Sequence, residues 1–454
     1  MKQYETYKDS GIQWLGKVPS HWEITPLKYN LSLKGRIGWN GLKSDEFKES
    51  SYAYLVTGQD FNKADIDWSS CYQIDKKRYE EDPFIQLSNG DLLVTKDGTI
   101  GKVAKVSNLD KPACLNSGIF VVKRLNPTFE SNFLYWTFVS NQLLDFNNFN
   151  SSGSTIQHLY QNVFENMPLL VPLKEEQKAI ASYLDYKVSQ IDAAIKEKEA
   201  MLEDLKAYRT AIISEAVTKG LDKGVTFVES GNEAIGNIPL GWKVMKTLYC
   251  LSMPITDGPP TTPELLDEGI PFISAEAVSC GNGKIDFTHK RGYISQDFYE
   301  ECCNKYIPQR NDIYMIKSGA TTGKVAIVDT DEIFTIWSPL AVFRCDIEVM
   351  LPSYMFYLLQ STLYQSQVEL GWSFGTQQNI GMRVLEKIPV PVPPIEEQQS
   401  IVEHITNKIY KLDKAIGELS QSSNDLQSYK SSVISEAVTG KVDLRNWNKK
   451  TVTA

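Results

Sequence analysis

The sequence has little of what metal sites and disulfide frameworks require. Its 454 residues include seven cysteines, an odd number, and four histidines. No two cysteines form a Cys-x-x-Cys pair, and no histidine lies at metal-ligand spacing from a cysteine. In so long a chain a disulfide framework is not expected, so we interpret the cysteines as reduced and mostly buried.

The sequence also lacks a long apolar run and an excess of basic residues. The first ten residues, MKQYETYKDS, have no apolar signal-peptide core, so a cytoplasmic protein with no membrane association is expected. The formal net charge is −9, with 47 Lys and Arg against 56 Asp and Glu. Taken alone this charge disfavours nucleic-acid binding, but binding depends on the local field of one face, where cations can be concentrated.

The sequence contains an internal repeat: one pattern of segments occurs twice, at a spacing of about 221 residues. A Gly-Pro-Trp segment, a strand and turn, a Pro-rich stretch and the hexapeptide Ile-Ser-Glu-Ala-Val-Thr all recur. The four pairs are 10–22 with 230–242, 91–104 with 312–326, 167–177 with 388–398, and 213–218 with 434–439. Residues 36–87 and 257–308 resemble each other only weakly, which indicates one frame that carries two different surfaces.

Each copy is predicted to be an α+β domain, comprising residues 1–172 in the first and 221–393 in the second. Both contain β-branched and aromatic runs broken by Gly, Asn, Asp and Pro. A helix-like stretch is expected in each, at Ser131–Leu144 and at Pro352–Gln367. The 454 residues exceed what one compact core accommodates, so two such domains are the natural division.

A long helix is predicted after each domain, at 173–220 and 394–440, and residues 441–454 form a C-terminal tail. Apolar residues fall at steps of three and four, with interruptions at Lys198, Arg209, Ser423 and Lys430. Such a narrow stripe needs a partner helix, and the chain supplies one of equal length. We expect an antiparallel coiled-coil-like pair and a pseudo-twofold molecule; an ordinary core stripe in each domain is the alternative. The two seams are Leu184, Val188, Ile191, Ile195, Leu202, Leu205 and Ile212, and Ile405, Ile409, Leu412, Ile416, Leu419, Leu426 and Val433.

Three motifs resemble catalytic ones without satisfying them. Residues 319–324 are one residue short of a phosphate loop, and Val325 stands where Ser or Thr would bind Mg²⁺, so a β-turn is favoured. Residues 126–129 resemble an adenine-methyltransferase motif but have no counterpart in the second copy, so we interpret them as a turn. Residues 45–48 read best as a solvated charge run. Catalysis is therefore expected to lie in partner proteins.

Several motifs resemble those of the specificity subunits of type I restriction-modification enzymes, and the resemblance extends over essentially the whole chain. They are Gly16-x-x-Pro19-x-x-Trp22, the stretches 35–42 and 257–273, the repeated Gly-Lys-Val-Ala turns, the loops 153–159 and 375–380, and the Glu-Glu-Gln helix starts after Pro172 and Pro393. One departure is the stretch 257–263, which lacks a His that relatives often carry.

The resemblance implies a non-catalytic subunit that reads a bipartite, asymmetric site on double-stranded DNA. Each target-recognition domain would read one half-site, and the helices would set the spacer and dock two methylation subunits. Motor-nuclease restriction subunits would join for cleavage. No cofactor is expected on this chain; S-adenosylmethionine, ATP and Mg²⁺ would serve the partners. The alternatives are a scaffold with no DNA role and the recognition half of a fused methyltransferase or nuclease.

Candidate DNA-binding residues are cations and amides in the loops and turns. Arg and Asn can bind guanine and adenine edges bidentately, and Lys recurs on both sides of the repeated turn, as phosphate contacts would require. A plain surface loop, a helix cap or a solvent-facing helix start is the competing interpretation. The candidates are Arg36, Trp39, Asn40, Lys43, Lys76, Lys77, Arg78, Lys96, Lys102, Gln157, His158, Thr261, Thr262, His289, Lys290, Arg291, Lys317, Lys324, Gln377, Gln378 and Asn379.

Overall fold

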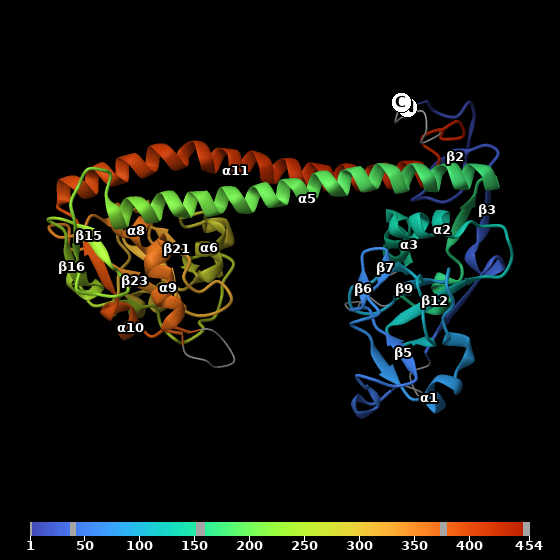
Figure 1. Ribbon diagram of the computed structural model, residues 1–454, viewed down its shortest axis with the longest axis horizontal. Helices are drawn as coiled ribbons and strands as arrows, with labels where there is room; N and C mark the ends of the chain where they lie inside the picture. Colours follow the sequence, from blue (N-terminus) through green and yellow to red (C-terminus); the bar gives the residue numbers. More distant parts are fainter. Residues whose placement is uncertain (1, 37–41, 151–158, 373–378, 448–454) are drawn as a thin grey trace. The chain divides into compact units, whose positions relative to one another are not determined.

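The computed structural model describes residues 2–36, 42–150, 159–372 and 379–447 (Figure 1). The chain forms two compact units. Unit 1 comprises Met1–Lys198 and Gln421–Ala454, and unit 2 comprises Glu199–Ser420. Two long helices, α5 (Lys174–Lys219) and α11 (Ile395–Val438), each contribute one half to unit 1 and the other half to unit 2.

Each unit contains a four-stranded antiparallel sheet, and equivalent strands follow the same order. In unit 1 the order is β10 (Val103–Lys105), β9 (Leu92–Thr95), β12 (Ile119–Arg124) and β4 (Leu31–Gly35). In unit 2 it is β21 (Val325–Ile327), β20 (Ile313–Ile316), β23 (Leu340–Phe343) and β17 (Thr256–Asp257). The sequence repeat is therefore a repeat of topology.

A three-stranded sheet accompanies it in each unit, with a central strand that pairs parallel on one side and antiparallel on the other. The strands are β11 (Ala113–Leu115), β5 (Ala53–Val56) and β8 (Tyr72–Ile74) in unit 1, and β22 (Thr335–Ile336), β18 (Ile270–Ile273) and β19 (Gly292–Ile294) in unit 2. These strands include the weakly similar segments, so the shared frame extends further than the sequence pattern indicates. The insertions differ: unit 1 has a hairpin of β6 (Phe61–Asn62) and β7 (Asp65–Ile66), and unit 2 has α6 (Ala275–Cys280).

The central strands of the four-stranded sheets, β9 and β12 in unit 1 and β20 and β23 in unit 2, contain apolar runs that are buried on both faces. In β9, Leu92 and Val94 belong to the core shared with the helices, whereas Leu93 faces a second core with the three-stranded sheet. In β20, Ile313 and Tyr314 divide in the same way. Each unit is thus layered as helices, sheet and sheet, with two apolar cores.

Both predicted stretches are helical, but each is divided by a break into two helices. Unit 1 has α2 (Ser131–Val139) and α3 (Asn141–Asn150), and unit 2 has α8 (Pro352–Gln360) and α9 (Thr362–Leu370). Ser140 and Ser361 adopt extended backbone conformations at the breaks. The Ser361 hydroxyl accepts from the Tyr364 backbone N–H at 3.3 Å and caps α9.

The halves of α5 and α11 run antiparallel within each unit, as expected. In unit 1 the early α5 residue Asp192 pairs with the late α11 residue Lys430; in unit 2 the late α5 residue Arg209 pairs with Asp413. Apolar residues flank both pairs. Ile191 and Ile195 of the predicted seam share a core with Val433. In unit 2 Ile213 shares a core with Ile405 and Ile409, whereas the predicted seam residue Ile212 is only partly buried.

A buried glutamine fixes the start of each long helix. The Gln398 side chain donates to the carbonyls of Val349 and Pro393, both at 2.9 Å, and accepts from the Leu351 N–H at 2.8 Å. Gln177 makes the equivalent bonds in unit 1. The repeated Glu-Glu-Gln motif therefore ties the long helix to the chain before α2 or α8.

The ends of the long helices pack under the Gly-Pro-Trp segments. Gly440 has φ +70°, and a Cβ there would lie 2.5 Å from Pro19 and 3.1 Å from Trp22; Gly220 lies against Trp242 in the same way. The remaining paired strands, which include these segments, are β1 (Tyr7–Asp9) with β2 (Lys17–Pro19), β3 (Glu23–Pro26) with β13 (Pro168–Val171), β14 (Phe227–Glu229) with β15 (Asn237–Pro239), and β16 (Lys243–Lys246) with β24 (Pro389–Val392).

Candidate nucleic-acid interface

The repeated turn connects two antiparallel strands in both units. Residues 96–102 join β9 to β10, and 317–324 join β20 to β21. The Thr95 hydroxyl donates to the Thr99 carbonyl at 2.6 Å and accepts from the Lys102 N–H at 2.9 Å, which closes the first turn. A strand follows each turn, so no helix N-terminus is available for a phosphate. The interpretation as a turn is confirmed.

The repeated lysines divide into an inner and an outer pair. Lys96 is half-buried, with Nζ 5.1 Å from the centre of the Phe120 ring, and Lys317 places Nζ 3.2 Å from the Asp257 carboxylate. Lys102 and Lys324 are exposed. The outer pair is therefore the more accessible of the two.

The ends of β4 and β17 carry different charged residues in the two units. Arg36 is 2% exposed and donates through Nε to the Leu115 carbonyl at 3.0 Å, so its interpretation as a surface-loop residue is wrong. In the sheets Gly35 lies opposite Phe120 and Asp257 lies opposite Ala341, so Gly258 is the counterpart of Arg36. Asp257 pairs with Lys305 and Lys317. Each unit thus has a charged side chain where the other has a glycine: a buried cation in unit 1 and an ion-paired carboxylate in unit 2.

The basic cluster of unit 1 is the start of the short helix α1 (Lys76–Glu80), which was the competing interpretation for it. Arg78 is engaged by Glu46 at 2.6 Å and by Glu81, and Lys76 lies 3.6 Å from Glu80. Lys77 and Lys43 are exposed. Two of the three cations in the cluster thus have carboxylate partners.

The basic cluster of unit 2 combines a histidine–carboxylate hydrogen bond with a stacked arginine. His289 Nδ1 lies 2.8 Å from Asp286, whose pKa is lowered to about 2 by hydrogen bonds from Thr288 and His289. The Arg291 guanidinium stacks 3.8 Å from the centre of the Trp337 ring, and Lys290 lies 4.8 Å from the Tyr293 ring. Exposed guanidinium stacks of this kind suit nucleic-acid contact. The sequence alone did not indicate Trp337 as a candidate, because it lies 46 residues from Arg291.

The remaining candidates lie in or near loops. Thr261 and Thr262 are exposed, and they follow Gly258, where a Cβ would lie 2.0 Å from the Ile336 carbonyl oxygen. Asn379 is exposed and forms a β-bridge with Ser318, next to Lys317. Trp39, Asn40, Gln157, His158, Gln377 and Gln378 lie outside the described residues.

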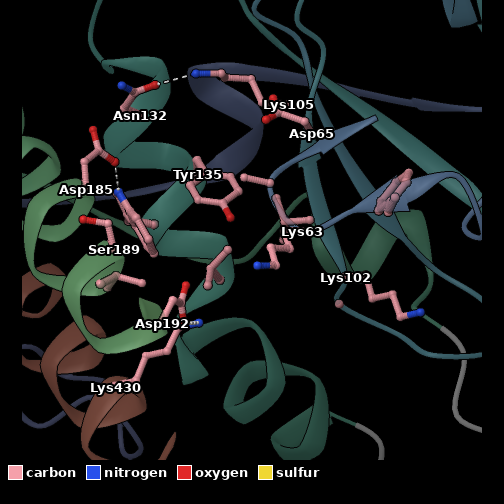
Figure 2. A pocket seen from close by; sticks show the side chains of 17 residues that line it. Lys63, Asp65, Lys102, Lys105, Asn132, Tyr135, Asp185, Ser189, Asp192 and Lys430 are labelled. Carbon is pink, nitrogen blue, oxygen red and sulfur yellow. Dashed lines mark hydrogen bonds and ion pairs between the residues drawn. The ribbon is translucent and has the colours of Figure 1, made fainter. Parts of the chain in front are cut away.

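A hollow of about 810 Å³ lies in unit 1 between the β6–β7 hairpin, α2 and α5 (Figure 2). Lys63 extends into it, and Lys102 points away from it. Two of its polar contacts hold α5: Trp136 Nε1 of α2 donates to Asp185 at 2.8 Å, and Lys430 of α11 pairs with Asp192. Sequence reasoning missed this hollow. A smaller one of about 420 Å³ in unit 2 has Lys324 and Arg209 at the equivalent places of Lys102 and Lys430.

Within the described ranges, no group of three or more His, Cys, Asp or Glu is arranged to hold a metal ion. No described helix is long and apolar enough to cross a membrane.

The comparisons with known proteins decide the family. The type I restriction modification DNA specificity domain matches residues 41–203 and 259–419, once in each copy and over more than half of the chain. The chain belongs to this family. Its place there is that of a specificity subunit, which is a non-catalytic component of type I restriction-modification systems.

Two named relatives are similar to this chain over most of its length. The specificity subunit of the type I restriction enzyme MjaVIII of Methanocaldococcus jannaschii is 23% identical, over 95% of each chain. That of EcoBI of Escherichia coli is 24% identical, over 78% of this chain and 73% of its own. A chain from a structural study of the assembly and conformational transition of the type I R-M system has a TM-score of 0.65 at 17% identity, with 94% and 99% covered, and shares the fold.

Proposed function

We propose that this protein reads a bipartite, asymmetric site on double-stranded DNA, with one half-site for each unit. The observation that carries the proposal is the duplicated frame with unlike surfaces. Both units have the same sheets and outer lysines, yet Arg36 of unit 1 stands where unit 2 has Gly258, and Asp257 of unit 2 stands where unit 1 has Gly35. A frame used twice supplies the same backbone contacts twice, and the differing surfaces select different bases.

Exposed cations supply the sequence-independent part of binding in this proposal. Lys102 and Lys324 occupy equivalent turns, and the Arg291–Trp337 stack adds a planar cation in unit 2. Their contacts with phosphates account for binding by a chain of net charge −9, because only the local field of the contacting face matters.

The helices set the spacing between half-sites and dock two methylation subunits. Motor-nuclease subunits join this assembly for cleavage. S-adenosylmethionine, ATP and Mg²⁺ serve those partners, and this chain binds none of them. Its place of action is the cytoplasm, where the DNA and the partner subunits are found.

An exchange of domains tests the proposal. Residues 1–172 are replaced by the equivalent segment of another family member, the chimera is produced with its methylation subunits, and modified bases are mapped across the host genome. One half of the methylation motif is expected to change and the other to persist. The reciprocal exchange of 221–393 should alter only the half that the first exchange left intact. A continuous or palindromic motif, or an exchange that alters both halves, contradicts independent readers.

A further inference from the structure

An open groove of about 630 Å³ runs along α5 in unit 2, where the last turns of the helix and the chain after it face His404 and Lys408 of α11. Its apolar lining is unusually accessible. Tyr208 is 59% exposed, Phe227 39% and Leu221 38%. Exposed apolar side chains gathered around one hollow indicate a surface that another molecule covers.

The equivalent groove of unit 1 is already filled. The Trp447 ring of the C-terminal tail lies 5.7 Å from the Tyr183 ring and 6.0 Å from the Tyr186 ring. Tyr183 stands 221 positions before His404 and is 5% exposed, whereas His404 is exposed. Leu444 of the same tail is buried at the position that Lys223 occupies in unit 2.

We infer that the unit 2 groove binds a peptide segment of a partner protein, which inserts one large aromatic side chain where Trp447 lies in unit 1. The two grooves are built from equivalent positions of one repeated frame, so the occupant of the first shows the chemistry that fits the second. Aromatic side chains in preformed pockets commonly anchor such contacts.

The rim of the groove selects the charge of the segment. Lys219, Lys223 and Lys408 face Glu215 and Asp222 around the opening, an excess of positive charge. A segment with acidic residues beside its aromatic anchor is complementary to this rim.

The tail of a second copy is a poorer occupant, because the tail is engaged within its own unit. The Asp443 N–H donates to the Lys2 carbonyl at 2.9 Å, and Lys441 Nζ donates to the Lys17 carbonyl at 2.5 Å. Release of the tail would expose Leu444 and Trp447. The inference thus places a partner on unit 2 and goes beyond the proposed reading of DNA.

The test uses a fluorescent peptide with the sequence of residues 441–447 as the probe and the full-length chain as the receptor. Fluorescence anisotropy is expected to show binding that Tyr208→Lys weakens by about tenfold or more. Tyr429→Lys, at the equivalent helix position beside the filled groove, is the matched control and should change affinity by less than about twofold. A probe with Trp447→Ala should not bind, and one with Arg445→Glu should bind more tightly.

Stoichiometry gives a second readout. Isothermal titration should find one probe site on the chain, and two when Trp447→Ala in the chain itself vacates the unit 1 groove. Equal binding by the Tyr208→Lys variant, or no binding by the unaltered chain at about 1 mM probe (an affinity of about 4 kcal/mol), would overturn the inference. So would self-association in sedimentation that both Trp447→Ala and Tyr208→Lys abolish, since the occupant would then be a second copy. The domain exchange measures DNA recognition separately. A failure of the groove inference can therefore be distinguished from a failure of the proposed DNA reading.

Discussion

The carboxylate of Asp192 and the ammonium of Lys430 lie 2.7 Å apart and join α5 to α11 inside unit 1. Unit 2 contains the reciprocal pair: Arg209 stands 221 positions before Lys430, Asp413 stands 221 positions after Asp192, and these two lie 2.7 Å apart. Two of the four polar interruptions of the seams, Arg209 and Lys430, are therefore partners of carboxylates on the opposite helix. Such pairs specify register and direction more than they add stability.

Charge reversal at Asp192 tests that role. Asp192→Lys places two ammonium groups together and should lower the free energy of unfolding by about 1 kcal/mol, because the pair is partly exposed and screened. Adding Lys430→Asp should restore most of the loss. Urea denaturation of both single variants and the double variant yields the coupling energy. If the double variant is no more stable than the summed effects of the two single variants predict, the pair does not specify register or direction.

Loss of the buried glutamine should be costly. Gln398→Ala leaves the Val349 and Pro393 carbonyls and the Leu351 N–H without their partner, so unfolding should become easier by about 2–3 kcal/mol. Gln399→Ala, one residue further along and exposed, should change it by no more than about 0.5 kcal/mol. Thermal and urea unfolding of the two variants provide the comparison; similar losses in both would contradict a locking role for Gln398.

Substitution at Gly440 separates backbone strain from steric overlap. Gly440→Ala combines φ +70° with a Cβ only 2.5 Å from Pro19, and it should cost about 2–4 kcal/mol. Gly236→Ala has the same φ of +70° with nothing within 4 Å, and should cost only about 1 kcal/mol. The difference between their unfolding free energies measures the contact between the helix end and the Gly-Pro-Trp segment. Equal costs would mean that this contact carries no packing constraint.

The sequence indicated those parts of the fold that rest on local pattern. Runs without Pro or Gly and with apolar steps of three and four predict long helices, and the repeat predicts two similar domains. The helix breaks at Ser140 and Ser361 were not predicted, because a serine inside an apolar pattern does not by itself indicate a helix end. Once the chain turns there, its hydroxyl can cap the next helix.

Side-chain placement depended on contacts that local pattern does not contain. Arg36 read as a surface residue because a charged side chain among glycines usually is one. Its acceptor, the Leu115 carbonyl, lies 79 residues away, and the fold brings the two together. The contacts of Trp337 and Trp447 were not predicted for the same reason, since the partner of each is remote in sequence.

The outer lysines should carry phosphate contacts. Lys102→Ala and Lys324→Ala are each expected to weaken binding to all DNA sequences alike and to reduce the salt slope of log K by about 1. Lys317→Ala is the control, because its ammonium already neutralises Asp257, and its salt slope should change less. Binding isotherms of the assembled complex at several salt concentrations give the slopes. An altered preference among bases would assign the outer lysines to base reading.

The long helices should act as a ruler in the proposed function. Four residues inserted after Lys198 and four after Leu419 lengthen both helices by about one turn, or roughly 6 Å. Both sites lie between the two ion pairs, so the Asp192–Lys430 and Arg209–Asp413 pairs are kept. Because four residues are close to the 3.6 of one turn, the seam stays nearly in phase. The same half-sites should then be methylated with a gap longer by about two base pairs, at roughly 3.4 Å each.

Two-residue insertions at the same places rotate the seam by about 200° and should expose Leu202 and Leu205, with loss of stability or of partner binding. Methylation motifs of the three proteins give the outcome, and an unchanged gap after the four-residue insertions would show that the helices do not set the spacing.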